Sequence, residues 1–283
     1  MKEFVLGNGV ALPAVGFGVY QGAVTQGPEP VAMALEAGYR YIDTAAFYHT
    51  EEFVAQAVAS SGIPREEICI ASKVWRTDLG YENVKRSFSE SLERLQTDYL
   101  DLFLIHWPKP EPLYPDWKLL DIESWCAMEE IYESGQARAI GVSNFLPHHL
   151  ENLKEHCRIL PMVDQLEFHP GYTQPAAVSY CRENGMLVQA WSPMGRARVF
   201  KEPLILELAE KYGVSPAKIC LLYDVQRGVM VLPKASSAAR IRDNLDLFSV
   251  TLSQEDLYRI DTLPQCGWSG EHPDRETVKP EIS

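Results

Sequence analysis

Tyr41-Ile42-Asp43-Thr44-Ala45-Ala46-Phe47-Tyr48-His49-Thr50-Glu51 is the stretch that decides the fold. It begins as an apolar strand, places Asp43 where the apolar run ends, and carries Tyr48 in a loop before a helix opens at Thr50. In a barrel of alternating strands and helices, the residue that ends a strand faces the mouth where active sites form. A solvated loop aspartate and a packed tyrosine are the alternative interpretation of this stretch taken alone.

Short apolar strands and amphipathic helices alternate about eight times outward from this stretch. We expect strands at 14–18, 39–43, 68–73, 99–105, 137–142, 162–167, 187–191 and 229–232. We expect helices at 29–37, 51–60, 82–95, 123–133, 147–156, 174–184, 203–212, 215–226, 238–247 and 253–262. Residues 3–12 form a hairpin with its turn at 7–9. The pattern predicts a single domain over residues 1–283, an α/β fold of the (β/α)8 TIM barrel type with an N-terminal β-hairpin cap.

A dinucleotide-binding Rossmann domain is the competing interpretation, because Gly16, Gly18 and Gly22 lie close together. The third glycine is out of register with that fingerprint and no helix follows directly, so we reject it.

Composition and charge exclude several classes of function. The formal net charge of -13 argues against nucleic-acid or anionic-membrane partners, which require a basic face. No apolar run approaches membrane-spanning length, and residues 1–9 lack the apolar core of a signal peptide, so we expect a cytoplasmic protein. The six cysteines are scattered without a C-x-x-C pair, which favours reduced thiols over disulfides or a metal site.

Polar side chains end one predicted strand after another. They are Asp43 with Tyr48, Lys73, His106, Ser143, Asn144, Gln165, Glu167, His169, Trp191 and Ser192. Charged and polar groups at such positions are costly unless they pair with one another. Each also has a structural interpretation: a surface lysine, a histidine bonded to a carbonyl, a tryptophan in the core.

Together four of these residues form an acid–base set. A tyrosine hydroxyl, with a pKa near 10, is a poor acid at neutral pH, and we expect the Lys73 ammonium to lower the pKa of Tyr48. Asp43 would keep that ammonium charged, and His106 would hold a carbonyl oxygen in line with the hydroxyl. The set contains no nucleophile and no metal cage, so it is suited to protonating an oxygen that gains negative charge.

At this point the sequence resembles the aldo-keto reductase family over nearly its whole length, and most of all its bacterial-type, 2,5-diketogluconate reductase-like members. The matching pieces are Gly16-Phe-Gly, Asp43-Thr-Ala with Tyr48, Ser72-Lys73, His106-Trp107-Pro108, Gly141-Val-Ser-Asn-Phe145, Gln165, Trp191-Ser-Pro-Met-Gly195 and Leu232-Pro-Lys234. The resemblance implies an NADP(H)-dependent oxidoreductase in which Tyr48 is the general acid. It implies that Lys73 and Asp43 tune this acid and that His106 orients the carbonyl.

The same resemblance implies a set of residues that bind the cofactor NADPH/NADP+. Around the nicotinamide these are Ser143, Asn144, Gln165, Trp191 and Ser192, and around the adenosine 2′-phosphate they are Lys234, Ser237, Arg240, Asp243 and Asn244. The phosphate would meet the free amides at the start of a helix. Ala235 replaces a serine common in the family, which removes one phosphate hydrogen bond and would blunt the preference for NADPH over NADH. We further hypothesise that Arg196 or Arg198 contacts the pyrophosphate; a solvated loop pair is the alternative.

The substrate pocket is expected to be lined by Tyr20, Phe47, Trp75 and Trp107, by the loop 113–115 and by the tail 266–270. Aromatic walls suit small aldehydes, dicarbonyls and keto sugars without selecting among them. We therefore expect a monomeric reductase of small carbonyl compounds that binds no metal. A regulatory NADPH-binding protein on the same barrel is the alternative, and a metal-dependent barrel hydrolase has too few predicted ligands at its strand ends.

Overall fold

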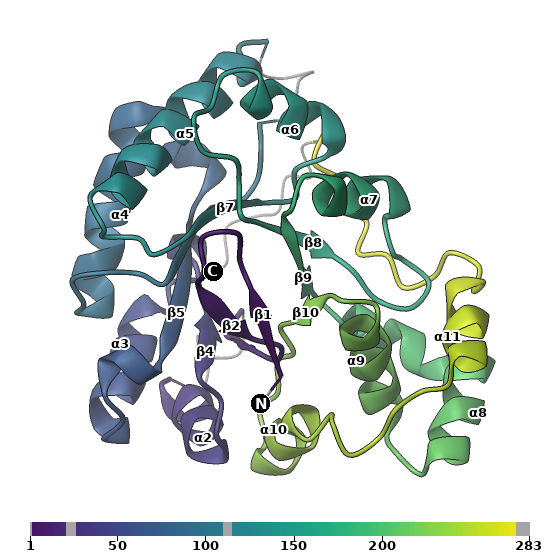
Figure 1. Cartoon of the computed structure of the whole chain (residues 1–283). Helices are drawn as coiled ribbons and strands as arrows, with labels where there is room; N and C mark the ends of the chain where they lie inside the picture. Colours follow the sequence, from purple (N-terminus) through teal and green to yellow (C-terminus); the bar gives the residue numbers. More distant parts are fainter. Residues whose placement is uncertain (1, 21–26, 110–114, 276–283) are drawn as a thin grey trace.

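Eight parallel strands form the centre of the molecule (Figure 1). The computed structural model describes residues 2–20, 27–109 and 115–275. The strands follow one another around the sheet in chain order, and they are β3 (Phe17–Gly18), β4 (Tyr41–Asp43), β5 (Cys69–Val74), β6 (Leu102–Ile105), β7 (Ile140–Ser143), β8 (Val163–Glu167), β9 (Leu187–Trp191) and β10 (Met230–Val231). A parallel bridge between Val15 and Val231 joins the last strand to the segment that leads into the first. The sheet is thus closed into the predicted (β/α)8 TIM barrel.

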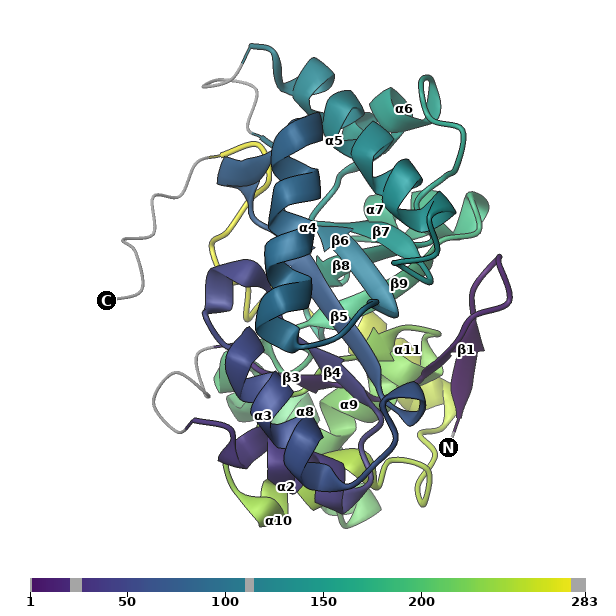
Figure 2. The same cartoon turned by 90° about the vertical axis from the view of Figure 1, so that its left-hand side faces the viewer.

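Helices surround the strands as an outer layer (Figures 1 and 2). Those that alternate with the strands are α2 (Glu29–Ala37), α3 (Glu51–Ser61), α4 (Tyr81–Leu95), α5 (Trp117–Glu133), α6 (Pro147–Lys154), α7 (Pro175–Glu183), α9 (Pro216–Gln226) and α10 (Ala238–Leu245). Two further helices, α8 (Pro203–Tyr212) and α11 (Gln254–Asp261), pack together beside α9. The short 3-10 helices that matter below are η1 (Ala46–Tyr48), η2 (Arg65–Glu67), η3 (Arg76–Asp78) and η4 (Gly195–Lys201).

The predicted hairpin closes the amino-terminal end of the barrel. Strands β1 (Glu3–Val5) and β2 (Ala11–Pro13) pair antiparallel, and the buried side chains of Leu6 and Leu12 pack against the barrel interior. Figure 2 shows the hairpin at one end of the barrel and the last described residues at the other. Of the described residues, none belongs to a helix that is both long and apolar enough to span a membrane.

Most predicted elements lie within three residues of the observed ones, and α5 is the main exception. It begins at Trp117, six residues before the predicted start at 123. Its first turns bury Trp117 and Asp121, so a charged residue occupies an inward position and interrupts the apolar periodicity there. β6 is shorter than predicted because Leu100 forms only an isolated bridge before the strand begins.

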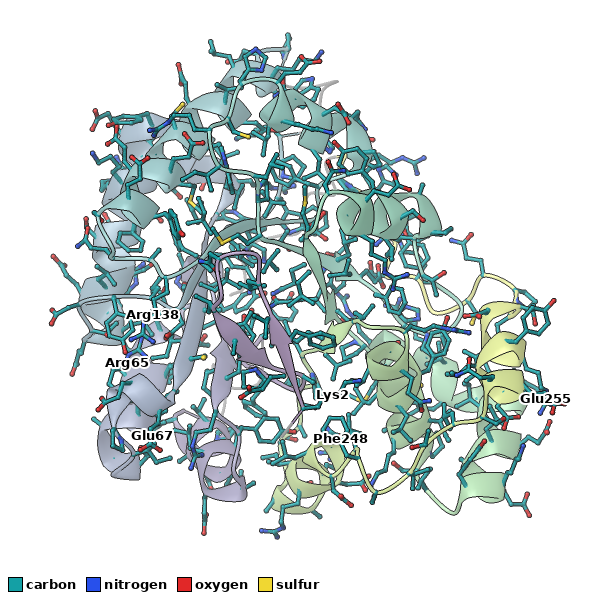
Figure 3. All side chains as sticks on the ribbon, viewed as in Figure 1. Lys2, Arg65, Glu67, Arg138, Phe248 and Glu255 are labelled. Atoms are coloured by element: carbon teal, nitrogen blue, oxygen red, sulfur yellow. The ribbon has the colours of Figure 1, made fainter. Side chains whose placement is uncertain are left out.

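One buried carboxylate braces the amino-terminal end of the barrel. Asp101 accepts hydrogen bonds from Arg65 at 2.9 Å, from Arg138 at 3.2 Å and from the backbone N–H of Ile70 at 2.9 Å. The two guanidinium carbons also lie 4.1 and 4.5 Å from the centroid of the Tyr99 ring. Figure 3 shows Arg65 and Arg138 close together beside the hairpin. We call Asp101, Arg65, Arg138 and Tyr99 the Asp101 clasp.

Candidate active site

A buried ion pair lies at the opposite, carboxyl-terminal end of neighbouring strands β4 and β5. The Nζ of Lys73 donates to Oδ1 of Asp43 at 2.6 Å and to the carbonyl oxygen of Thr44 at 2.9 Å. The other Asp43 oxygen accepts a hydrogen bond from Nε2 of Gln165 at 2.9 Å. The Lys73 side chain is 0% exposed, so its charge is compensated entirely within the protein.

Tyr48 and His106 face each other next to this pair. The Tyr48 hydroxyl lies 3.3 Å from Nε2 of His106, and Nζ of Lys73 is 5.2 Å from the centroid of the Tyr48 ring. Tyr48 ends η1, which follows β4, and His106 follows β6 directly. The predicted acid–base set is therefore assembled in space from three strand ends.

The titration behaviour of the set differs from the prediction in one respect. Burial, followed by the Asp43 carboxylate, raises the pKa of Tyr48 well above its usual value, so the lowered pKa that we expected for this hydroxyl is not found in the free site. Burial lowers the pKa of Lys73, against the opposing effect of Asp43. Burial, then the charges of Lys73 and Arg76, lowers the pKa of His106 well below its usual value, which makes the imidazole neutral at physiological pH.

A second group of predicted residues forms a hydrogen-bonded platform beside this set. Nδ2 of Asn144 donates to the carbonyl oxygen of His106 at 3.0 Å, and its Oδ1 accepts from Nε1 of Trp191 at 2.8 Å. Ser143 donates to the backbone oxygen of Gln165 at 2.7 Å. Asn144 has a φ of +64°, a conformation that asparagine tolerates better than most residues. These bonds fix the polar atoms at the ends of β7, β8 and β9.

A single cavity of about 1220 Å³ connects these groups to α10. Its lining includes most of the predicted residues: Tyr20, Asp43, Phe47, Tyr48, Trp75, His106, Trp107, Ser143, Asn144, Gln165, Trp191, Ser192, Lys234, Arg240, Asp243 and Asn244. Two predicted residues are not part of the lining. Lys73 is bonded to Asp43, and Ser237 accepts a hydrogen bond from Nε of Arg240 at 3.1 Å. The cavity exceeds the 300–1,000 Å³ or so of a typical ligand pocket and has room for a cofactor beside a small substrate.

The end of the cavity at α10 carries positive charge. Lys234 precedes the helix and Arg240 lies in its first turn, and both line the cavity. Burial and then the charge of Arg240 lower the pKa of Lys234. Asp243 accepts a hydrogen bond from the Ser215 hydroxyl at 2.9 Å, which ties α10 to the start of α9. A phosphate group would meet two cations and the amino-terminal end of a helix here, so the residues present fit an NADPH-type cofactor.

Trp75, Phe47 and Tyr20 form the aromatic wall near Tyr48. The Phe47 and Trp75 rings are stacked, with their centroids 3.8 Å apart. The centroids of the Tyr20 and Tyr48 rings are 4.9 Å apart. Trp107 and Trp191 also line the cavity, and their ring centroids are 6.4 Å apart. Of the loop predicted at 113–115, residues 113 and 114 lie outside the described residues.

Three cavity residues from the end of the described chain were missed: Glu271, His272 and Arg275. They belong to residues 264–275, which we call the C-terminal segment. It has no regular periodicity, so no sequence pattern assigns it to the site. The predicted tail 266–270 belongs to this segment but does not line the cavity. Arg76 and Lys109, which follow the predicted strand ends more distantly, were also missed.

The C-terminal segment is held by side chains from the barrel. Both oxygens of Glu167 accept hydrogen bonds from Ser269, from its N–H at 2.9 Å and its hydroxyl at 2.7 Å. Arg198 donates to the carbonyl oxygens of Gly267 and Trp268. Of the two arginines proposed to contact a pyrophosphate, only Arg196 lines the cavity, and it pairs with Glu271 at 2.8 Å.

Two histidines at the start of α6 hold the far end of the same segment. Nε2 of His148 and Nε2 of His149 lie 3.0 and 3.2 Å from Oδ1 of Asp274. Nδ1 of His149 accepts the Leu146 N–H at 3.0 Å, so the proton of its neutral ring is on Nε2 and faces the carboxylate. A metal ion at this group would need Nε2 of His149 to lose its proton. The three side chains therefore hold the segment by hydrogen bonds and not through a metal ion.

Comparisons with known proteins show what the chain and its fold are similar to. The model of the family described as Aldo/keto reductase family matches residues 25–264. The glyoxal reductase of Bacillus subtilis (strain 168) is 45% identical over 278 residues, which is 97% of this chain and 97% of that protein. A crystal structure of an aldo/keto reductase from Brucella melitensis has a TM-score of 0.86 at 38% identity and covers 92% of this chain and 98% of that one. A Bombyx mori aldo-keto reductase, crystallised in complex with NADP, has a TM-score of 0.83 at 33% identity and covers 92% of each chain.

Proposed function

The chain belongs to the aldo/keto reductase family, and on that premise we propose that it reduces small aldehydes, ketones and dicarbonyls to alcohols with NADPH. One barrel domain over residues 1–283 carries the whole activity. The relative named glyoxal reductase supports small dicarbonyls within this range. The observation that carries the proposal is the Tyr48 hydroxyl 3.3 Å from His106, beside the buried Asp43–Lys73 pair and inside the cavity.

The cofactor is held along the length of the cavity. Lys234, Arg240 and the amino-terminal end of α10 would bind the adenosine 2′-phosphate, with Ser237, Asp243 and Asn244 beside it. Ser143, Asn144, Gln165, Trp191 and Ser192 would bind the nicotinamide end, and Arg196 would contact the pyrophosphate. When bound there, NADPH would supply from C4 of its nicotinamide the hydride that the carbonyl carbon gains. Ala235 carries no hydroxyl, so the discrimination against NADH is smaller than a serine there would give.

Tyr48 is the proton donor. Its raised pKa keeps the hydroxyl protonated in the free site, so a proton is available at the moment the carbonyl oxygen gains negative charge. The neutral imidazole of His106 holds that oxygen against the Tyr48 hydroxyl. Lys73, fixed by Asp43, places a positive charge beside the Tyr48 ring and stabilises the phenolate that remains after transfer.

The experiment that tests the proposal is NADPH oxidation with glyoxal, methylglyoxal and a panel of aldehydes, in the wild type and in Tyr48→Phe. We expect kcat to fall by roughly 10²- to 10⁴-fold in the variant, because it loses the general acid. NADPH affinity, measured by fluorescence titration, should change less than about threefold. Tight NADPH binding with no turnover of any carbonyl in the wild type would contradict the reductase and favour a regulatory, cofactor-sensing protein on the same barrel.

Location and assembly complete the proposal. The chain is a cytoplasmic monomer whose only partners are NADPH and its substrate, without nucleic acid or membrane. Its charge of -13 supports the last two exclusions. Sedimentation of the purified protein tests the monomer directly.

A further inference from the structure

Arg76 is a cavity-lining cation that holds neither the cofactor nor the carbonyl oxygen in the proposed reaction. It opens η3, immediately after Trp75, and its side chain is partly buried. Its guanidinium carbon lies 5.2 Å from the centroid of the Trp75 ring, which is a cation–π contact. Within the described parts of the chain, the guanidinium makes this ring contact but no hydrogen bond or ion pair, and its charge contributes to lowering the pKa of His106. Its five N–H donors are therefore available to a ligand.

The aromatic wall fixes the position of this guanidinium relative to the reacting groups. Phe47 stacks on Trp75 at 3.8 Å, and the edge-on contact between Trp75 and His106 brings their centroids to 5.0 Å. Arg76 is thus separated from His106 by a single ring, and its guanidinium carbon is within about 10 Å of the imidazole centroid. A carbonyl compound with its oxygen between Tyr48 and His106 would extend its carbon skeleton along this wall.

Acidic residues that share the cavity or the short helix with Arg76 are already paired with other cations. Asp43 is bonded to Lys73 at 2.6 Å, and Glu271 is bonded to Arg196 at 2.8 Å. Asp78, in the same short helix, lies 3.3 Å from Arg86 on the outer surface. A protein of net charge -13 thus presents an uncompensated cation next to its aromatic pocket.

We propose that Arg76 binds a carboxylate on the substrate, so that the preferred substrates are oxo acids: aldehydes or ketones that carry a carboxylate a few carbon atoms from the carbonyl. This inference rests on the proposed carbonyl reduction. The planar guanidinium can bind both carboxylate oxygens at once. The carboxylate is unchanged by the reaction, in which the carbonyl carbon gains the hydride and its oxygen gains the proton.

Two closely related probes test the proposal: 4-carboxybenzaldehyde, which carries the charge, and its methyl ester, which is neutral and larger by one methyl group. We expect the wild type to have a kcat/KM roughly 10- to 100-fold higher for the acid, mainly through KM, because a charged hydrogen bond contributes on that scale. Arg76→Gln should bring the ratio of the two kcat/KM values to within about threefold of one, and Arg76→Lys should restore part of it. The preference for the acid should also weaken as salt is raised at saturating NADPH.

Arg86→Gln is the matched control, because it removes one positive charge from a neighbouring, exposed arginine that does not line the cavity. It should leave the ratio at the wild-type value. Equal kcat/KM for acid and ester in the wild type, or an unchanged ratio in Arg76→Gln, would overturn the carboxylate proposal while leaving the reductase intact. A larger gain for glyceraldehyde 3-phosphate over glyceraldehyde than for acid over ester would assign Arg76 to phosphate instead. Failure to reduce any probe would overturn both proposals.

Discussion

The two ends of the barrel each bury a carboxylate that is paired with cations, yet they use it differently. In the Asp101 clasp both oxygens of the carboxylate are bonded, and its two arginines remain 21% and 46% exposed. At the other end Asp43 is paired with a lysine that is 0% exposed, and the neighbouring His106 leaves its buried Nδ1 without a described partner. Satisfied groups braced by solvent-exposed cations indicate a structural role. Buried charge beside unsatisfied groups and a cavity indicates a site where charge is to be moved.

The largest difference between the two ends should appear when the lysine is removed. We expect Lys73→Met to lower kcat by roughly 10²- to 10³-fold, because the carboxylate of Asp43 is left beside Tyr48 without a counter-charge. The same unpaired charge should also lower the free energy of unfolding. Steady-state kinetics measure kcat, and urea unfolding measures the stability. The double variant Lys73→Met/Asp43→Asn should recover stability without recovering kcat. Recovery of activity in the double variant would mean that the pair is structural, like the Asp101 clasp.

A substitution in the Asp101 clasp should lower the stability of the protein and leave its activity unchanged. We expect Asp101→Asn to lower the free energy of unfolding by about 3 kcal/mol, because two arginines and one backbone N–H lose a charged acceptor. Its kcat/KM per folded molecule should stay within about twofold of the wild type. A larger kinetic change at a temperature where the variant is fully folded would show that the two ends are coupled.

The smallest effect concerns pH and belongs to His106. Its folded-state pKa lies well below the unfolded value near 6.5, so the unfolded chain takes up a proton first as pH falls. The stability contributed by the neutral ring is fully present above about pH 6.5 and is lost progressively below it, by up to about 1.4 kcal/mol per pH unit. Urea unfolding of wild type and His106→Gln from pH 8 to pH 5 should show a shallower decline in the variant. Parallel curves would contradict the depressed pKa.

Sequence reasoning predicted the barrel and much of the site for one physical reason. Parallel strands joined by helices bring their carboxyl-terminal ends together, so a polar residue after each apolar run belongs to a common mouth. Asp43, Lys73 and His106 could be identified in this way because each directly ends or follows a strand. The order of the elements followed from the same alternation.

The sequence could not reveal what depends on burial or on contacts without a pattern. The pKa of Tyr48 is raised because the hydroxyl is enclosed, which no local spacing encodes. Glu271 reaches the cavity because Glu167 and Arg198 hold the backbone and a serine of the C-terminal segment, and such bonds leave no periodicity. Arg76 follows Trp75, which the sequence did place in the pocket. Only the contact between its guanidinium and the Trp75 ring shows that its charge lies beside the pocket.

The anchoring of the C-terminal segment also has a consequence for how substrate range can diverge in descendants of this chain. Glu271, His272 and Arg275 shape the cavity, but their positions are set by Glu167 on β8, Arg198 in η4 and the paired histidines of α6. If recombination exchanged the C-terminal segment alone, the new segment would lack the residues on β8, η4 and α6 that hold it in its parent protein. Substitutions at His272 or Arg275 would change the cavity lining while leaving the bonds of Glu167 and Arg198 to the segment in place.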